Sequence, residues 1–212
     1  MTMPSLLTPT QPTVLMVDQQ AGLAFEVGSI DRQALLGNVI ALAKTTRAVN
    51  LPIVVSTSAS AVYSGPLMPA VQEFLPGVAS LERHSMNAWE DAAVRAAVEN
   101  TGRKKLLVSG LLTEACVSFT VLSALADGYD VSVVADACGG VTNDGHSLAL
   151  RRMEAAGATM TSWLQVLLEL QRDWTRKETY ADARAIVEAR AGGYGIGLAY
   201  ARDMIHPVKS TG

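Results

Sequence analysis

The segment KKLLVSGLLTEACVSFT, Lys104 to Thr120, combines a short apolar run, a glycine and a cysteine. Residues 105–110 have the length and composition of a buried strand, and residues 114–127 are expected to form the next helix, with Gly128 behind it. A strand that leads directly into a helix is the repeating unit of parallel α/β sheets. The segment therefore predicts an α/β fold and places Cys116 where a strand gives way to a helix.

The rest of the chain alternates between strand and helix in the same way. Such alternation implies parallel pairing, with helices on both faces of one sheet. We predict a three-layer α/β/α sandwich of the Rossmann-like kind, with a mainly parallel six-stranded sheet, over residues 1–174. The expected strands are 13–18, 51–58, 78–84, 105–110, 131–137 and 159–162, and the expected helices are 31–49, 89–100, 114–127, 145–156 and 164–172.

Residues 175–212 depart from this alternation. A helical stretch is expected at 180–191, followed by the glycine-rich apolar sequence AGGYGIGLAYA. A solvated tail is normally more polar, and a monomer would leave this apolar surface in water. We therefore predict a C-terminal helical arm that packs on a neighbouring subunit of a homo-oligomer.

Composition limits the classes of partner. The chain has 212 residues, of which 49% are hydrophobic and 17% charged, and a formal net charge of −3 without a basic block. Nucleic acid is a poor partner for such a surface, and no apolar run approaches the roughly 20 residues of a membrane span. With two cysteines expected to be free thiols and no signal-peptide pattern, the expected location is cytoplasmic and the expected partner a small molecule.

Three polar or reactive residues follow predicted strands: Asp18, Arg83 and Cys116. The carboxyl ends of parallel strands meet at one edge of the sheet, so these side chains are expected to converge there. Thr113 is a good N-cap residue, which would put Cys116 in the first turn of a helix. The dipole and free amides of that turn would lower the thiol pKa from about 8.5 toward neutrality and could hold an oxyanion.

Each of these residues also has a structural interpretation. Asp18 could cap a helix, and Cys116 could pack as a small hydrophobe, which is the commoner fate of cysteine. Cys138 has no helix start beside it and is the weaker candidate nucleophile. His84 could be the base of a Cys–His dyad. The three histidines, at 84, 146 and 206, lie far apart and show no metal-ligand spacing.

Several segments together resemble the isochorismatase-like cysteine hydrolases, and most of all the YcaC-like branch of uncharacterised hydrolases. The likeness extends over roughly Thr13 to Trp174. Together the segments are specific, although none would be so alone. They are VDQQ after the first strand, a basic residue after the third, NAW at 87–89, GLLTEACV, ALADGYDVSVVADACGG and the region of His146.

The resemblance implies a catalytic triad of Asp18, Arg83 and Cys116. Arginine stands where most of the superfamily has lysine, although it fits the YcaC-like branch. Arginine stays protonated, so it cannot shuttle protons but can fix the carboxylate and attract a thiolate. The resemblance also implies a homo-oligomer, and the family indicates an octamer.

Further residues follow from the same resemblance. A cis peptide is implied between Leu112 and Thr113, with the amides of Ala115 and Cys116 cradling the oxyanion. Gln20, Asn87 and Trp89 are expected to bind the substrate, although Trp89 could equally be a core residue. No cofactor is implied. The nicotinamidases of this superfamily hold zinc after the second strand, but STSASAVYSGPLMP contains no histidine or carboxylate, so no metal is expected.

The leading functional hypothesis is a metal-independent cysteine hydrolase that cleaves a small amide or related C–N bond through a thioester. A second hypothesis is a redox-sensing or thiol-reactive protein that uses Cys116 without hydrolysis. A third is a ligand-binding homologue that has kept the fold without catalysis. Asp18 favours the hydrolase, because a redox sensor needs no acid to protonate a leaving group.

Overall fold

The computed structural model describes residues 6–205. Its six strands form one sheet in the order β3-β2-β1-β4-β5-β6, and every neighbouring pair is parallel. The predicted three-layer α/β fold is confirmed, and the sheet is wholly parallel. The strands are β1 Pro12–Val17, β2 Ile53–Ser58, β3 Ser80–Arg83, β4 Lys105–Leu111, β5 Asp130–Gly139 and β6 Thr159–Thr161.

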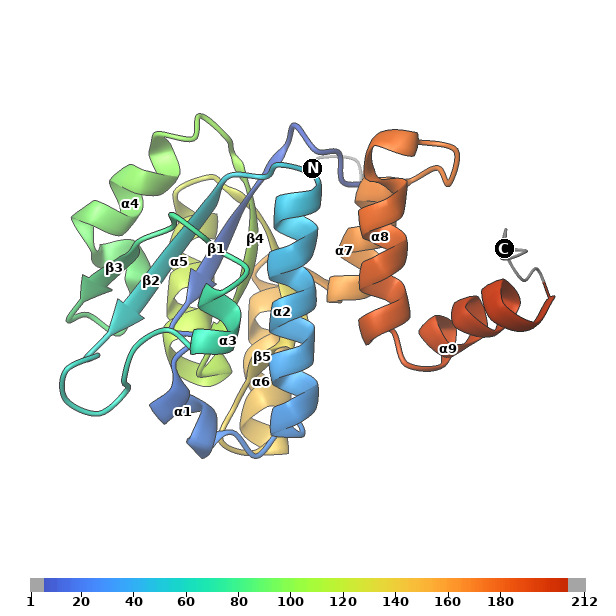
Figure 1. Ribbon diagram of the computed structural model, residues 1–212. Coiled ribbons are helices and arrows are strands. Elements are labelled where there is room, and N and C mark those ends of the chain that lie inside the picture. The colour runs from blue at the N-terminus through green and yellow to red at the C-terminus, as the bar shows by residue number, and fades with distance from the viewer. Residues whose placement is uncertain (1–5, 206–212) are drawn as a thin grey trace.

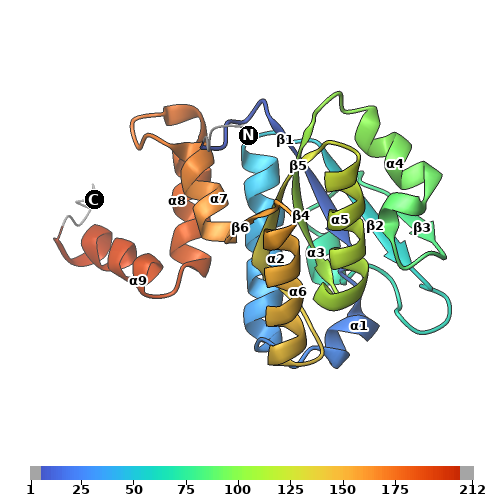
Figure 2. The same ribbon diagram turned by 180° about the vertical axis from the view of Figure 1, so that it is seen from behind.

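Helices cover both faces of the sheet (Figures 1 and 2). One face is covered by α2, α3 and α7, with α8 packed on α2 and α7, and the other face by α4, α5 and α6. No helix among the described residues is long and apolar enough to cross a bilayer. The helices are α1 Ala21–Glu26, α2 Arg32–Ala48, α3 Pro69–Gln72, α4 Ala92–Glu99, α5 Ser118–Ala126, α6 Asn143–Ala155, α7 Trp163–Gln171, α8 Lys177–Arg190 and α9 Gly193–Tyr200.

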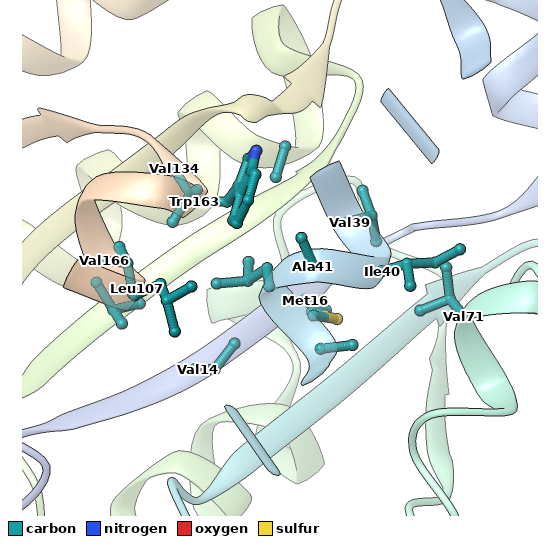
Figure 3. Packing of buried hydrophobic residues seen from close by; sticks show 14 of the residues in the cluster. Val14, Met16, Val39, Ile40, Ala41, Val71, Leu107, Val134, Trp163 and Val166 are labelled. Carbon is teal, nitrogen blue, oxygen red and sulfur yellow. The ribbon is translucent and has the colours of Figure 1, made fainter. Parts of the chain in front are cut away.

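The central strand β1 divides its side chains between two hydrophobic cores. Val14 and Met16 pack in the core beneath α2 and α7, where Figure 3 shows Val14 near Leu107 of β4 and Met16 near Ala41 of α2. Leu15 and Val17 point into the core on the other face. Successive side chains of a strand alternate between faces, so a strand covered on both sides is apolar throughout. This burial fixes the register of β1 and hence the position of the residue that follows it.

The helix expected at 89–100 is broken near its start. A 3₁₀ turn, Ala88–Glu90, comes first, and α4 begins after Asp91. The Asp91 carboxylate accepts hydrogen bonds from the amides of Ala93 and Val94, as a helix N-cap does. The short helices α1 and α3 were not predicted, because six- and four-residue helices carry little periodicity.

The C-terminal region is divided differently from the prediction. Ala183, Ile186 and Val187 of α8 are buried in the core beneath α2, so α8 belongs to the body of the domain. Only α9 and the turn Ala201–Ile205 project from it (Figure 1). The expected arm over 175–212 therefore reduces, in the described chain, to 193–205. Residues 206–212, which include His206, lie outside the described residues.

Candidate active site

The candidate site lies where the strand order reverses. From β1 the chain adds β2 and β3 on one side, then returns to add β4 on the other side, so the carboxyl ends of β1 and β4 flank the switch. Ligands bind at such points in doubly wound sheets. The two strand ends are packed tightly: a Cβ at Gly110 would lie 2.1 Å from the carbonyl oxygen of Val17. Asp18 and the Cys116 segment begin directly beyond this contact.

Asp18 ends β1 in a left-handed conformation. Its φ is 54°, a region that few residues other than glycine adopt, and its side chain is fully buried. The Asp18 amide donates to the Ser56 carbonyl of β2 at 2.9 Å, and the Gln20 amide donates to the Asp18 carbonyl at 2.7 Å. Backbone strain of this kind is often concentrated at functional sites.

Arg83 reaches Asp18 from the end of β3, two strands away. Its Nη1 and Nη2 donate to the two Asp18 oxygens at 2.5 and 2.6 Å, and neither side chain is exposed. Nη1 also donates to Ser56 Oγ at 2.9 Å, and Nη2 to the Met86 carbonyl at 3.1 Å. Burial disfavours the guanidinium charge, but the hydrogen bonds and charge of Asp18 outweigh it and raise the pKa of Arg83. The Arg83 charge is thus engaged by Asp18.

Cys116 lies in a π-helical turn, Thr113–Val117, and its side chain is half-buried. Burial, then the charge of Asp18 and a hydrogen bond with it, raise the pKa of Cys116 to about 12. Arg83 and the Leu112 amide act in the opposite direction but are weaker. The expected lowering of the thiol pKa is therefore wrong, because burial and the charge of Asp18 raise the pKa more than Arg83 and the Leu112 amide lower it. The thiol is neutral at rest, with the Asp18 carboxylate beside it.

The segment before the cysteine differs from the prediction in three details. The cis peptide joins Leu111 and Leu112, one residue earlier than expected, at the end of β4. Leu112 occupies the N-cap position, and the Thr113 hydroxyl instead pairs with His146 Nδ1 at 2.8 Å. The Ala115 amide already donates to the Leu112 carbonyl at 3.1 Å, so it is not free to hold an oxyanion. The backbone amide of Leu112, in contrast, favours the thiolate of Cys116 and lowers its pKa.

The three residues expected to contact substrate have structural partners. Gln20 Nε2 donates to the Ser58 carbonyl at 3.0 Å and its Oε1 accepts from the Ser58 amide at 2.9 Å, so Gln20 fastens the loop after β2. Asn87 Oδ1 accepts from the Trp89 amide at 3.0 Å, and its Nδ2 donates to Ser123 Oγ at 2.9 Å. Contact of Gln20 and Asn87 with a substrate remains a prediction.

Trp89 is a core residue, which was the alternative to substrate binding that the sequence left open. Trp89 is 3% exposed, and its ring packs edge-on against that of Tyr129, with the ring centroids 4.9 Å apart. Its Nε1 donates to Asp127 at 2.8 Å. A buried tryptophan with a satisfied N–H is a packing residue.

Residues that the sequence reasoning passed over join the site to β5. Gln19 is fully buried, and its Nε2 donates to the Ala137 carbonyl at 2.8 Å. Glu114 Oε1 accepts from the Val141 amide at 2.8 Å and so holds the cysteine turn against the loop after β5. These two residues could have been predicted from the sequence, because both are polar and lie within two residues of Asp18 or Cys116.

The two histidines within residues 6–205, His84 and His146, take no part in the pairing of Asp18 with Arg83. His84 is exposed, because it follows the inward-facing Arg83 in an extended strand end, so a Cys–His dyad through His84 is not formed. Burial, opposed by the charge of Glu114, lowers the pKa of His146. Among residues 6–205, no three His, Cys, Asp or Glu side chains are grouped as metal ligands.

A buried acid–arginine pair and a neutral thiol lie at the switch point of a parallel sheet, an arrangement that is compatible with a hydrolase that uses a cysteine. The comparisons with known proteins agree with this class. Residues 12–165 match the isochorismatase domain model. The chain therefore belongs to the isochorismatase family of hydrolases.

Similar proteins cover most of the chain. The probable hydrolase YcaC of Escherichia coli is 39% identical over 162 residues, which are 76% of this chain and 78% of that protein. The structure of YcaC from Pseudomonas aeruginosa, with hexane-2,5-diol and covalent acrylamide, superposes with a TM-score of 0.89 at 36% identity, over 94% of this chain and 98% of that one. The structure of the E. coli protein, an octameric hydrolase of unknown specificity, gives a TM-score of 0.88 at 35% identity, with the same shares of the two chains covered.

Proposed function

We propose that this protein is a metal-independent cysteine hydrolase that cleaves a small amide or related C–N bond through a thioester on Cys116. The observation that carries this proposal is the buried Asp18–Arg83 pair beside a protonated thiol. A fixed acceptor next to a neutral nucleophile is the arrangement of general-base activation.

The steps follow from the positions of the three side chains. Asp18 accepts the Cys116 proton as the sulfur forms a bond to the substrate carbonyl carbon. The backbone amide of Leu112, which favours the thiolate, is the donor that we propose for the developing negative charge. The C–N bond breaks when the protonated Asp18 returns its proton to the leaving amine. Water, deprotonated by Asp18, then attacks the thioester and releases the carboxylic acid and the free thiol. Arg83 holds the Asp18 carboxylate in place throughout.

The redox-sensing hypothesis is less well supported. Redox-sensor cysteines are accessible and have a low pKa, so that the thiolate is available to oxidants. Cys116 is half-buried and its pKa is raised, which makes it a poor spontaneous nucleophile without the acceptor beside it. The same features fit a thiol that is activated only during catalysis.

The two cysteines offer a matched test of the nucleophile. Incubation with a panel of small amides should give a thioester on Cys116, detected by mass spectrometry of quenched samples. Cys116→Ala should remove both the adduct and turnover. Cys138→Ala should retain both, because Cys138 is buried in the core with its pKa raised to about 12. An adduct on Cys138, or turnover in Cys116→Ala, would contradict the assignment.

We also propose that the protein assembles as a homo-oligomer through α9. Ile196, Tyr200 and Met204 are exposed on the projecting segment 193–205, and E. coli YcaC is octameric. Contact between a projecting arm and a neighbouring subunit would bury this apolar surface.

Substitution of one arm residue tests the assembly. Ile196→Glu places a charge on the arm and should reduce the particle mass at micromolar concentration, measured by sedimentation velocity. Leu148→Glu is the matched control, since Leu148 is exposed on α6 in the body. Dissociation by Leu148→Glu alone would show that the arm does not make the contact.

A further inference from the structure

The loops around Cys116 have an unusual charge composition. These loops follow β1 to β5 at the carboxyl edge of the sheet and span residues 18–31, 59–68, 84–91, 112–117 and 140–142. None of them contains a lysine or arginine. Besides Asp18 they contain the carboxylates Glu26, Asp31, Glu90, Asp91 and Glu114. The edge of the sheet that holds the thiol is therefore acidic.

The two arginines that border these loops are already engaged. Arg83 ends β3, and both of its terminal nitrogens bind Asp18. Arg32 begins α2, and it donates to the carbonyls of Ala24 at 3.2 Å and Phe25 at 2.8 Å at the end of α1. The remaining Arg83 nitrogen, Nε, makes no hydrogen bond but is buried, so it is not exposed to a substrate carboxylate.

Exposed apolar side chains surround the same edge. One or more follow each of the strands β1 to β5, and two are connected directly to the site. The Met86 carbonyl accepts a hydrogen bond from Arg83, and the Val141 amide donates to Glu114. Met86 is 66% exposed. We refer to the whole set as the apolar rim, and it consists of Phe25, Val62, Tyr63, Met86, Phe119 and Val141.

We propose that the Cys116 site takes uncharged amides that carry an apolar substituent and rejects substrates that carry a carboxylate. The inference rests on the proposed hydrolase function and adds the chemical class of substrate. A carboxylate that entered would lose hydration and meet acidic side chains without a free cation to pair with. An uncharged amide avoids this cost, and its apolar substituent would cover part of the rim.

Two alkylating reagents that differ only in charge test the proposal without a known substrate. Iodoacetamide and iodoacetate both lose iodide to the attacking sulfur, but iodoacetate carries a carboxylate. Peptide mass spectrometry gives the rate of alkylation of Cys116 by each reagent, and the iodoacetamide rate is divided by the iodoacetate rate. The same ratio is measured for glutathione at the same pH, and the ratio for Cys116 is divided by it. We expect the preference for iodoacetamide over iodoacetate to be about tenfold larger at Cys116 than at glutathione, which corresponds to about 1.4 kcal/mol. The N-phenyl derivative of iodoacetamide should react at least as fast, relative to glutathione, as iodoacetamide.

A matched pair of variants tests whether the rim charge is responsible. Met86→Lys adds a cation to the apolar rim and should lower the preference for iodoacetamide severalfold. Asn100→Lys adds the same charge after α4, at the opposite edge of the sheet, and should leave the preference unchanged. Both positions are exposed, so both variants are expected to fold.

Several results would overturn the proposal. A ratio at Cys116 equal to that of glutathione would contradict the rejection of carboxylates, as would equal effects of the two lysine variants. Slower reaction of the N-phenyl derivative would contradict the role of the apolar rim. Failure of the proposed hydrolase function would give a different result from failure of this proposal. The preference for iodoacetamide would then persist, while no amide in the panel would form a thioester.

Discussion

Asp18→Asn is expected to abolish hydrolysis while speeding the alkylation of Cys116 at pH 8 by about 10- to 1000-fold. The charge of Asp18 and its hydrogen bond help to raise the pKa of the thiol to about 12. Asparagine removes that charge, and the cation of Arg83 then acts on the sulfur without compensation. A lower pKa gives tenfold more thiolate at pH 8 for each unit by which it falls.

The two effects are measured on the same samples. Labelling by iodoacetamide between pH 7 and 11 gives the rate at Cys116, and release of amine from a turned-over amide gives hydrolysis. Glu99→Gln is the control, because Glu99 is an exposed carboxylate at the end of α4, at the opposite edge of the sheet. It should change neither quantity appreciably. An unchanged labelling profile in Asp18→Asn would mean that Asp18 does not act on the thiol.

The opposite signs of the two effects distinguish the functions considered. In a redox sensor or a reactive thiol, more thiolate means more activity, so labelling and function would rise together. In a hydrolase the same change removes the group that accepts and returns the proton. A faster thiol in an inactive protein is therefore specific to general-base catalysis by Asp18.

The fold was predictable because its central strands are short, continuously apolar runs, as expected for strands of a parallel sheet that is covered on both faces. The run that ends at Asp18 and the run that begins at Lys105 are buried on both faces, and parallel strands with intervening helices leave few arrangements. Convergence of Asp18, Arg83 and Cys116 at one edge follows from parallel pairing alone. The extent of the C-terminal arm does not follow from strand pairing. Residues of α8 such as Ile186 and Val187 were predicted to belong to the arm but are buried in their own domain.

The electrostatics of the site were not predictable from the sequence. Arg83 was expected to stabilise a thiolate on Cys116, but burial of the thiol and the charge of Asp18 outweigh its effect on the pKa. How deeply the thiol is buried, and that Arg83 reaches Asp18 across two strands, are known only from the coordinates. The assignment of Thr113 as N-cap failed for a similar reason, because its hydroxyl found a tertiary partner in His146.

Arg83→Met should lower the free energy of unfolding by about 3 to 5 kcal/mol. Removing one partner of a fully buried ion pair leaves the Asp18 carboxylate without a countercharge in a site that it cannot leave. Urea unfolding followed by circular dichroism gives the change. Arg95→Met is the matched control, because Arg95 pairs with Asp127 at 2.6 Å with 46% of its side chain exposed, and its loss should cost about 1 kcal/mol or less.

The double variant Asp18→Asn with Arg83→Met separates a lost attraction from an uncompensated charge. If the cost of Arg83→Met comes from the buried lone carboxylate, replacing that carboxylate by a neutral amide should restore part of the stability even though the pair is gone. Arg83→Lys keeps the charge but loses the two-pronged geometry, so its stability should fall between those of wild type and Arg83→Met. A double variant less stable than Arg83→Met would contradict this account and would mean that Asp18 is held mainly by its other neighbours, such as Ser56.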